Sequence, residues 1–456
     1  MEHLIEHHCQ IPRVPDHRDL LTHYRRSVTG LDLGPRIPIR FAITATRQSH
    51  YSCEFATMAA DLSGASQPST DVFDFRRRVI QDNRTFNVAL VVPTGIGAEL
   101  GGHAGDAGPV ARLLGEIADT LVLHPNVVNA SDINEMPSNS LYVEGSVLTR
   151  LLMGTAGLLP VRANRVMVLI DAREDRLFEN AAVNAVSGAR AAYGLNCPEV
   201  VAVDPPLKMV ADYAFSGRAT GEVEGIDAMC SLLDERLGTF DAVSLSTVIN
   251  VPPDFHQLYF DSEGQMVNPW GGVEAMLTHA LSSIYDVPTA HSPMFESQEV
   301  ANADPGIIDP RMAAEAVSAT FLQCTLKGLM HSPRIITAPD IMKDDSVMAA
   351  EQIACLVIPR GCLGLPTLAA LEQGISVIEV GNRNLMRNDL SELPWAQGQF
   401  HRAGSYLEAA GILAAFRAGI SADSVKRPLQ PTKFSRWRRP GVSLAAGELR
   451  AASDIE

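Results

Sequence analysis

The spacing of apolar positions along the chain changes near residue 85. Residues 37–45 alternate between apolar and more polar side chains, and residues 51–55 repeat the alternation after a polar turn, so a β-hairpin is predicted there. Residues 1–35 contain three prolines and little periodicity, which indicates an arm. After residue 85, short apolar runs alternate with helix-length segments. This alternation is typical of parallel sheets covered by helices.

The expected strands after residue 85 are short and rich in β-branched and aliphatic residues, as buried parallel strands are. They cover residues 88–92, 120–123, 165–170, 199–203, 242–245, 334–337, 353–358 and 376–380. The expected helices cover residues 107–119, 177–192, 226–237, 272–285, 312–329, 366–373 and 405–420.

The expected fold class is therefore α/β, with two Rossmann-like parallel-sheet halves facing a cleft and a small β-rich N-terminal module. A chain of 456 residues exceeds one ordinary core, so more than one domain is expected. We assign residues 1–84 to the N-terminal arm and hairpin, 85–240 to a first α/β domain, 241–424 to a second, and 425–456 to a basic, proline-rich tail. The runs LVVPTGIGAELGG and LVIPRGCLGLPTL share a strand, a proline and a glycine turn. Duplication explains this echo, and so does the frequency of strand–turn–helix units in α/β proteins.

Glycines crowd residues 94–106, directly after the expected strand 88–92. Glycine lets the backbone adopt positive φ and approach a ligand closely, and the free N–H groups of the following helix point back at the loop. The segment therefore predicts an anion site, although it has neither the Lys-Ser/Thr ending of a phosphate loop nor the Rossmann glycine spacing. Its candidate substrate-binding residues are Thr94, Gly95, Gly97 and Asp106. Asp106 also fits a helix-capping role.

Polar side chains follow two of the expected strands. His124 comes directly after residues 120–123, and its usual pKa suits proton transfer near neutrality, although a hydrogen bond to a neighbouring loop explains it equally well. Asn126 and Asn129 are candidates for orienting a substrate carbonyl. Glu144 ends an apolar run and is a candidate base or arginine partner. We take His124 and Glu144 as candidate catalytic residues.

Further candidates lie in the second half of the chain. Gly271 and Gly272 open an expected helix, and His291 follows a short apolar run, which makes it a candidate catalytic residue. Glu379 and Asn382 end the expected strand 376–380 and would face the same cleft as the glycine loops.

A second glycine turn, Gly361-Cys362-Leu363-Gly364, precedes another expected helix. Gly361 and Gly364 are candidate substrate-binding residues. A thiol beside a helix N-terminus has a lowered pKa, which makes Cys362 a candidate nucleophile, although most cysteines are simply small core residues.

The composition limits the class of partner. The chain carries 53 acidic and 37 basic side chains, a net charge of −16, which argues against nucleic acid or an anionic membrane as the main partner. Seven cysteines without a C-x-x-C pair, and an N-terminus without an apolar core, predict a cytoplasmic protein with reduced thiols. No cofactor is predicted. No cluster has metal-ligand spacing, so a divalent metal held by the scattered His124, His291 and carboxylates is kept only as an alternative.

The runs VVPTGIGAELGGHAGDAGPVAR, LVLHPNVVNA, NPWGGVEAMLTHALS and ACLVIPRGCLG resemble the DUF3326 family of bacteria and plants, over roughly residues 85 to 425. The resemblance implies kinship without an assigned reaction. The family's loop carries tyrosine where this chain has His103, which lowers any catalytic role for that histidine. The segment GLPTLAALEQGISVIEV is also similar to the donor-sugar segment of two-domain glycosyltransferases.

The sequence thus favours a cytosolic enzyme that binds a small anionic metabolite between the turns at 94–106 and 360–365. Its chemistry would be acid–base catalysis at or next to a carbonyl, in the lyase, isomerase or hydrolase class. A glycosyltransferase-like enzyme using a nucleotide sugar and a non-catalytic ligand-binding protein are the alternatives. The arm and the basic tail suggest subunit contacts, so a homo-oligomer is expected.

Overall fold

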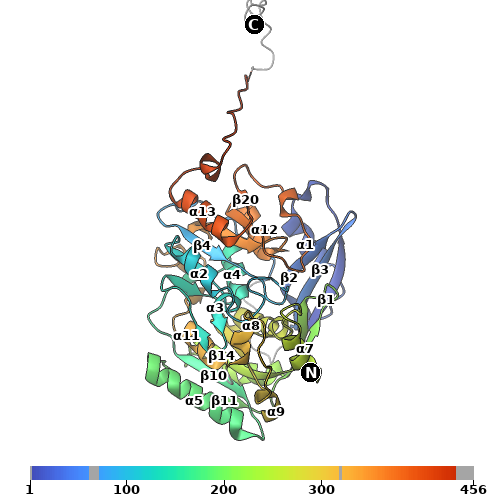
Figure 1. Ribbon diagram of the computed structural model, residues 1–456, viewed down its shortest axis with the longest axis vertical. Helices are drawn as coiled ribbons and strands as arrows, with labels where there is room; N and C mark the ends of the chain where they lie inside the picture. The colour runs from blue at the N-terminus through green and yellow to red at the C-terminus, as the bar shows by residue number, and fades with distance from the viewer. Residues whose placement is uncertain (1–2, 61–70, 318–320, 438–456) are drawn as a thin grey trace, which may run out of the picture.

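The structure is a computed structural model that describes residues 3–60, 71–317 and 321–437. Its upper part in Figure 1 contains a six-stranded sheet in the order β20-β19-β17-β4-β5-β8, in which all neighbours are parallel. The strands are β4 (Asn87–Leu90), β5 (Thr120–Leu123), β8 (Ser140–Tyr142), β17 (Ile353–Pro359), β19 (Ser376–Val380) and β20 (Phe400–Ala403).

Helices cover this sheet, and most positions of its central strands are buried and apolar. All four residues of β4 are buried, as both faces of a parallel sheet require. Two helix pairs pack together around the sheet, α2 (Gly108–Gly115) with α13 (Tyr406–Arg417) and α4 (Gly145–Leu152) with α12 (Leu365–Gln373). The predicted α/β class and the strands at 120–123 and 376–380 are confirmed.

A second, ten-stranded sheet is mixed. Its path is β11-β10-β14-β12-β13-β1-β3-β2-β18, with β15 paired to β14. The pairs of β10 with β11 and of β14 with β10, β12 and β15 are parallel, whereas the rest of the path is antiparallel. The strands are β1 (His3–Pro12), β2 (Arg36–Thr46), β3 (His50–Ala59), β10 (Val166–Asp171), β11 (Val200–Val203), β12 (Lys208–Tyr213), β13 (Ala219–Glu224), β14 (Ala242–Asn250), β15 (Thr289–Met294) and β18 (Leu363–Gly364).

The longest helices beside this sheet are α5 (Arg176–Tyr193), α6 (Ile226–Glu235) and α8 (Gly271–Tyr285). α8 contacts β2, β13 and β15 and also α4, so it lies between the two sheets. The smaller elements are α1 (Leu20–Thr29), α3 (Pro125–Val128), α7 (Phe255–Asp261), α9 (Gln298–Ala301), α10 (Ala313–Ala316), α11 (Leu322–Leu329) and two short strand pairs, β6 (Asn129–Ala130) with β7 (Ile133–Asn134) and β9 (Gly157–Leu159) with β16 (Arg334–Ile336).

The predicted division near residue 240 does not separate the two sheets. Strand β4 pairs with β17 in one sheet, and β10 pairs with β14 in the other, so each sheet combines strands from both predicted α/β segments. Backbone hydrogen bonds between strands far apart in the sequence leave no local signal, which is why the pattern alone suggested consecutive halves.

The arm predicted for residues 1–35 is wrong. Residues 3–12 form β1, which pairs with β3 from Ile5 opposite Thr57 to Pro12 opposite His50, and residues 20–29 form helix α1. The polar side chains that hid the strand have partners inside the fold, and Glu6 is the main example.

Glu6 belongs to a buried ion cluster formed by Glu6, Arg40, Glu54 and Arg218. Arg40 Nη2 lies 2.8 Å from Glu6 Oε2, and Arg218 contacts Glu6 and places its Nε 2.8 Å from Glu54 Oε2. Burial raises the pKa of Glu6, but the two guanidinium groups outweigh it and hold that pKa below its usual value. The cluster therefore joins β1, β2 and β3 to β13 through paired charges.

The helix predicted for residues 312–329 is interrupted. The structure has the short helices α10 and α11 instead, and residues 318–320 lie outside the described residues. Phe321, which precedes α11, has φ of +48°, a conformation that a continuous α-helix does not contain.

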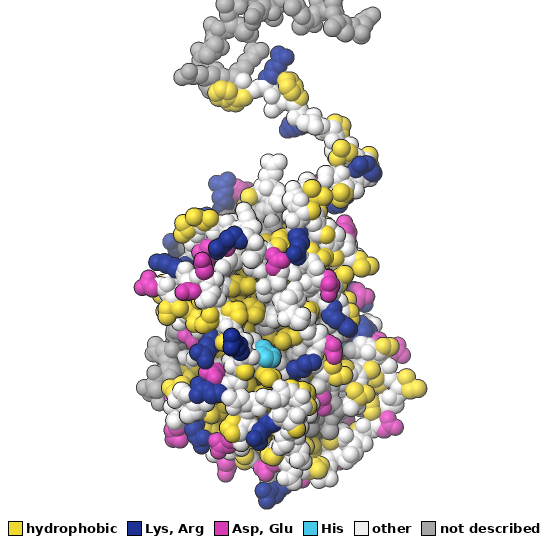
Figure 2. All heavy atoms as spheres, turned by 90° about the vertical axis from the view of Figure 1, so that its left-hand side faces the viewer, with side chains coloured by type: hydrophobic (Ala, Val, Ile, Leu, Met, Phe, Trp, Pro, Cys, Tyr) yellow, Lys and Arg dark blue, Asp and Glu magenta, His cyan; other side chains and the backbone are white. Residues whose placement is uncertain are grey.

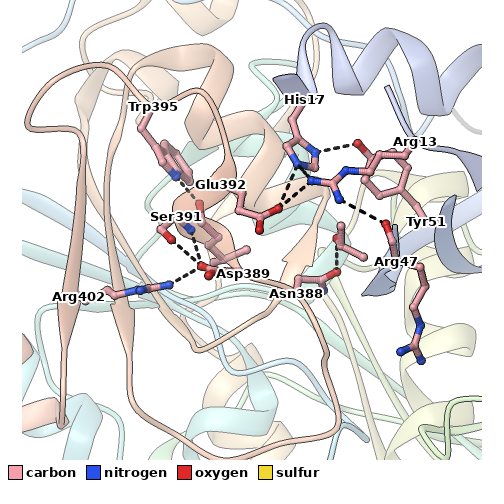
Figure 3. A network of polar contacts seen from close by, with 12 residues as sticks. Arg13, His17, Arg47, Tyr51, Asn388, Asp389, Ser391, Glu392, Trp395 and Arg402 are labelled. Atoms are coloured by element: carbon pink, nitrogen blue, oxygen red, sulfur yellow. Dashed lines mark hydrogen bonds and ion pairs between the residues drawn. The ribbon is translucent and has the colours of Figure 1, made fainter. Parts of the chain in front are cut away.

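A polar network joins the N-terminal strands to the segment after β19 (Figure 3). Arg13 donates to Glu392 at 2.9 Å, and His17 contacts Tyr51 at 2.7 Å and Arg13 at 3.0 Å. Nearby, Asn388 accepts from the Thr46 hydroxyl at 2.8 Å and donates to the carbonyls of Ile43 and Gly361, also at 2.8 Å. These contacts hold the second glycine turn against β2.

The described part of the predicted tail extends away from the body of the molecule (Figures 1 and 2). Residues 426–437 are exposed and contain no helix or strand, and residues 438–456 lie outside the described residues. On the face shown in Figure 2, Lys and Arg side chains lie among Asp and Glu side chains, in keeping with a mixed-charge surface.

We predict that Gly105→Ala destabilises the protein by about 2–4 kcal/mol, because it combines left-handed strain with overpacking. Gly105 has φ of +73°, and a β-carbon there would lie 2.1 Å from the Ala130 β-carbon. Gly108→Ala is the control, since a β-carbon at the first residue of α2 meets nothing within 4 Å and alanine favours the helix. Urea unfolding measures both. Equal stabilities of the two variants would contradict the prediction.

Candidate functional site

The carboxyl ends of the parallel strands bring several predicted residues to one edge of the six-stranded sheet. Thr94 follows β4, His124 follows β5, and Glu144 follows β8, while the second glycine turn follows β17 and Asn382 follows β19. The strands β17 and β4 are neighbours, so the two glycine turns leave adjacent strands. Ligands of α/β proteins bind at such an edge.

A first cavity of about 280 Å³ opens at this edge, between the glycine loop, α8 and β15. Eight of the predicted site residues line it: Thr94, Gly95, His124, Asn126, Asn129, Glu144, Gly271 and His291. Gly271 also packs closely on Thr94, since a β-carbon at Gly271 would lie 2.4 Å from Thr94 Cγ2.

Glu144 and His279 contact each other in the cavity wall. Glu144 is the N-cap of α4, where its Oε2 accepts from the Ser146 backbone N–H at 2.8 Å and from the Ser146 hydroxyl. Its Oε1 lies 2.6 Å from His279 Nδ1 and 3.4 Å from the Thr278 hydroxyl. No polar partner is seen for His279 Nε2 among the residues that the structure describes.

The charge of Glu144 follows from two opposed effects. Burial raises the pKa of the carboxyl, but His279 and the Ser146 hydrogen bonds outweigh it and bring that pKa below its usual value. Glu144 is thus a carboxylate near neutral pH. A carboxylate at Nδ1 favours the proton on that nitrogen and leaves the lone pair of His279 on Nε2.

His124 lies beside this pair and is neutral. Its Nε2 accepts the backbone N–H of Val92 at 3.1 Å, so its proton is on Nδ1. Burial lowers its pKa to about 4, with only partial compensation from Glu144. His124 therefore supports the loop after β4 and also lines the first cavity, but its pKa lies below the range that suggested proton transfer near neutrality.

His291 is held at both ring nitrogens. Its Nδ1 lies 2.9 Å from Glu274 Oε1, and its Nε2 lies 2.9 Å from the Thr247 hydroxyl. A ring fixed on both sides has no free nitrogen to exchange protons with a ligand. The His291–Glu274 pair therefore forms a fixed polar part of the cavity wall.

A third polar group at the first cavity consists of His103, Tyr259, Asn268 and Glu315. The Tyr259 hydroxyl contacts His103 Nδ1 at 2.8 Å and the Asn268 amide at 3.3 Å, and Glu315 accepts from Asn268 at 3.0 Å and from the Ala104 N–H at 2.7 Å. Burial raises the pKa of Glu315 to about 7.

Asp106, the last residue of the glycine-rich segment 94–106, does not line the first cavity. Its Oδ1 accepts the Gly101 N–H at 2.8 Å, whereas its buried Oδ2 has no hydrogen-bond partner among the described residues. Burial raises the pKa of Asp106 to about 7, and the nearby Glu315 carboxylate adds to the shift. Its position is neither that of a helix cap nor that of a cavity residue.

These raised pKa values predict a stability change with pH. Asp106 and Glu315 bind protons more tightly in the folded than in the unfolded chain, so the stability they contribute at low pH is lost as pH rises from about 4 to about 7. In the double variant Asp106→Asn, Glu315→Gln we expect the pH dependence of the free energy of unfolding between pH 5 and 8 to be flatter by on the order of 5 kcal/mol. Urea unfolding at both pH values tests this, and parallel pH profiles would contradict it.

Other predicted binding residues hold the loops. The Asn126 amide donates to the carbonyls of Val92 and Gly101 at 2.8 and 2.9 Å, and the Asn129 amide donates to the Tyr142 hydroxyl at 2.8 Å. Gly97 and Gly272 do not line the cavity. A β-carbon at Gly272 would lie 2.2 Å from the Ala219 carbonyl oxygen, so this glycine permits close packing of α8 on β13.

The predicted residues around the second glycine turn support that turn. Glu379 accepts the Gly361 N–H at 3.1 Å and pairs with Arg402 Nε at 2.8 Å, so both of its oxygens are engaged. Asn382 bonds both polar groups of the Leu100 backbone at 2.8 and 3.0 Å. Glu379, Asn382 and Gly361 thus lie outside the first cavity.

The expected activation of Cys362 is wrong. Burial raises the pKa of its thiol above the ordinary value, with a further contribution from Glu379. Cys362 and Gly364 instead line a second cavity of about 180 Å³.

His279 and Glu274 are the cavity residues that the sequence analysis missed. In α8, apolar residues surround Glu274, Thr278 and His279, which are neighbours on one side of the helix. A polar stripe on an otherwise apolar helix was the available signal. They were missed because the candidates were sought at the ends of strands, whereas these two residues are on a helix.

Within residues 3–60, 71–317 and 321–437, no three His, Cys, Asp or Glu side chains come together as a possible metal site. In the same described ranges, no helix has the length and apolar character needed to cross a membrane. All seven cysteines are free.

Comparison with known proteins shows which family the chain resembles. The family described as protein of unknown function (DUF3326) matches residues 87–426, which confirms the resemblance noted in the motifs. A protein of Synechococcus sp. named as an uncharacterized lipoprotein is 31% identical over 341 residues, which are 74% of this chain and 92% of that relative. No solved structure matches the chain.

Proposed function

The chain belongs to the DUF3326 family, and we propose that it is an enzyme that transfers a proton at or next to the carbonyl of a small anionic metabolite in the first cavity. This is chemistry of the lyase, isomerase or hydrolase class. The observation that carries the proposal is the His279 ring in the cavity wall, with Glu144 at one nitrogen and no described partner at the other.

In this proposal His279 is the general base. The Glu144 carboxylate fixes the ring and stabilises the imidazolium that forms when Nε2 takes a proton. Ser146 and Thr278 hold the carboxylate in turn, so the pair is oriented before a ligand arrives. The same imidazolium then returns its proton as a general acid.

His124 supplies a hydrogen-bond donor in this proposal. Its imidazole is neutral near pH 7 and carries its proton on Nδ1, so this N–H group can donate a hydrogen bond to an oxygen atom. Such a donor stabilises the negative charge that develops on a carbonyl oxygen when a neighbouring proton is removed.

The anionic character of the metabolite rests on helix ends. Gly271 at the start of α8 lines the first cavity, and the N-terminus of a helix favours negative charge. The start of α4 also reaches this cavity at Gly145, but the Glu144 carboxylate already caps that helix. Glu315 is half neutral near pH 7, which reduces repulsion from the wall.

The alternatives remain distinguishable. A glycosyltransferase-like enzyme would bind a uridine nucleotide sugar, and a non-catalytic binding protein would bind its ligand without turnover. Glu379 gives little support to the first of these, because Gly361 and Arg402 occupy its oxygens.

The proposal is tested by proton exchange. The full chain is incubated in D₂O with a panel of small carbonyl-containing carboxylic acids, and deuterium uptake next to the carbonyl is followed by ¹H NMR. Uptake above the buffer rate supports the proposal. Binding of panel members without uptake or product favours the non-catalytic alternative, and release of nucleotide from a nucleotide sugar favours the glycosyltransferase.

The location and subunit number belong to the same proposal. We propose a cytoplasmic homo-oligomer, whereas the name of the Synechococcus relative describes a lipoprotein. Native mass spectrometry reports the subunit number and any retained metabolite or metal. Cell fractionation distinguishes a soluble from a membrane-bound chain.

A further inference from the structure

The second cavity differs from the first in its chemistry. It lies between β2, α4, α8 and the second glycine turn, and most of its wall is apolar, with Ile39, Phe41, Val91, Leu148, Leu363 and Leu365 as examples. Apolar cavities of this kind stay dry and bind apolar molecules.

The two cavities adjoin at the proposed reacting groups. Thr94, His124, Gly145, Ala275 and His279 line both of them. A ligand whose reacting atom contacts His279 can therefore extend from the first cavity into the second. The apolar space lies where one end of a bound substrate would enter it.

The volume of the second cavity sets the size of its occupant. At about 180 Å³ it is close to the apolar cavity of about 150 Å³ that binds benzene in another protein. A single six-membered ring with one or two further carbons fits this space, and a long acyl chain does not.

Arg40 favours an aromatic ring over a saturated one. Its guanidinium is buried in the cavity wall, where Nη2 pairs with Glu6 and Nη1 donates to the Gly272 carbonyl at 3.2 Å. The buried Nε of Arg40 has no hydrogen-bond partner among the residues described. A guanidinium is attracted to the face of an aromatic ring and gains nothing comparable from an alkyl group.

We propose that the second cavity binds the aromatic ring of the substrate, so that the substrate class is a small arylalkyl acid with its carboxylate and carbonyl in the first cavity. The position of the reacting end rests on the proposed function. The ring site itself rests on the volume, the apolar wall and Arg40, and does not require turnover.

The test uses three inert acids as probes: propanoate, 3-phenylpropanoate and 3-cyclohexylpropanoate. Isothermal titration calorimetry on the full chain should give 3-phenylpropanoate an affinity about 30-fold or more above that of propanoate, since burying the ring removes its apolar surface from water. The cyclohexyl acid should bind more weakly than the phenyl acid. Dodecanoate should not show this gain in affinity over propanoate, because its chain is too long for the second cavity.

Two variants locate the effect. Ser283→Leu narrows the cavity from α8, where leucine suits the helix, and should remove the advantage of the phenyl acid. Ala275→Leu narrows the junction and is the second variant in case the first does not fold. Ser187→Leu, on the exposed side of α5, is the matched control and should leave the advantage unchanged.

The outcomes separate this inference from the proposed function. Equal affinities for propanoate and 3-phenylpropanoate, or an advantage that survives in both folded α8 variants, would overturn the ring site. A ring advantage without deuterium uptake for any acid would leave the ring site standing and count against the enzyme.

Discussion

A His279→Gln protein is expected to lose proton exchange by a factor of about 10² to 10⁴, the usual contribution of a positioned general base. Glutamine keeps the size and a donor toward Glu144 but has no titrating nitrogen in place of Nε2. The rate of deuterium uptake is the measured quantity. Thermal unfolding should change little, because the ring is partly exposed to the cavity and makes one polar contact.

The control for this variant is His331→Gln. His331 lies outside both cavities, and its Nδ1 contacts the Arg162 carbonyl at 2.9 Å. Its exchange rate should equal that of the wild type. An unchanged rate in His279→Gln would remove His279 from the proposed chemistry, and an equal loss in both variants would point to a general effect of removing imidazole.

The second large effect concerns stability. We expect Arg218→Met to lower the free energy of unfolding by about 3–5 kcal/mol, because it leaves the buried Glu54 without its arginine and Glu6 with Arg40 alone. Arg218 is 5% exposed and contacts both Glu6 and Glu54, and Glu54 is 1% exposed. Urea unfolding followed by circular dichroism measures the change.

A surface ion pair provides the matched comparison. Arg165 pairs with Asp241 at 2.8 Å, but its side chain is 45% exposed, so Arg165→Met should cost no more than about 1 kcal/mol. Adding Glu54→Gln to Arg218→Met should recover part of the loss, since it removes one uncompensated charge. Equal losses in the two arginine variants would show that the buried cluster contributes no more than a surface pair.

The elements predicted correctly are those whose own residues carry a clear apolar or amphipathic pattern. The runs at 120–123 and 376–380 were recognised because parallel strands covered on both faces are mostly apolar, with Thr120, Ser376 and Glu379 as the polar positions here. The helix expected at 177–192 corresponds to α5, which carries a long amphipathic pattern and a capping Asp175.

Elements stabilised by distant partners were missed or misread. Strand β1 was taken for part of an arm, because its sequence alone does not show that Glu6 is buried and paired with Arg40 and Arg218. The same limit applies to the candidate site. Glu144 could be singled out at a strand end, whereas His279 reaches it from α8, and no spacing rule connects the two.

The pairing of β4 with β17 also bears on how the chain reaches its fold. These neighbours are far apart in the sequence, and β18 joins β2 across a similar separation, so the contact order is high and folding should be slow. During synthesis, β4 and β5 leave the ribosome long before the strand that covers the other edge of β4. That edge stays open until the chain has grown past residue 359, and an open strand edge is a site of aggregation. Production of this protein should therefore depend on the rate of translation and on chaperones more than its final packing suggests.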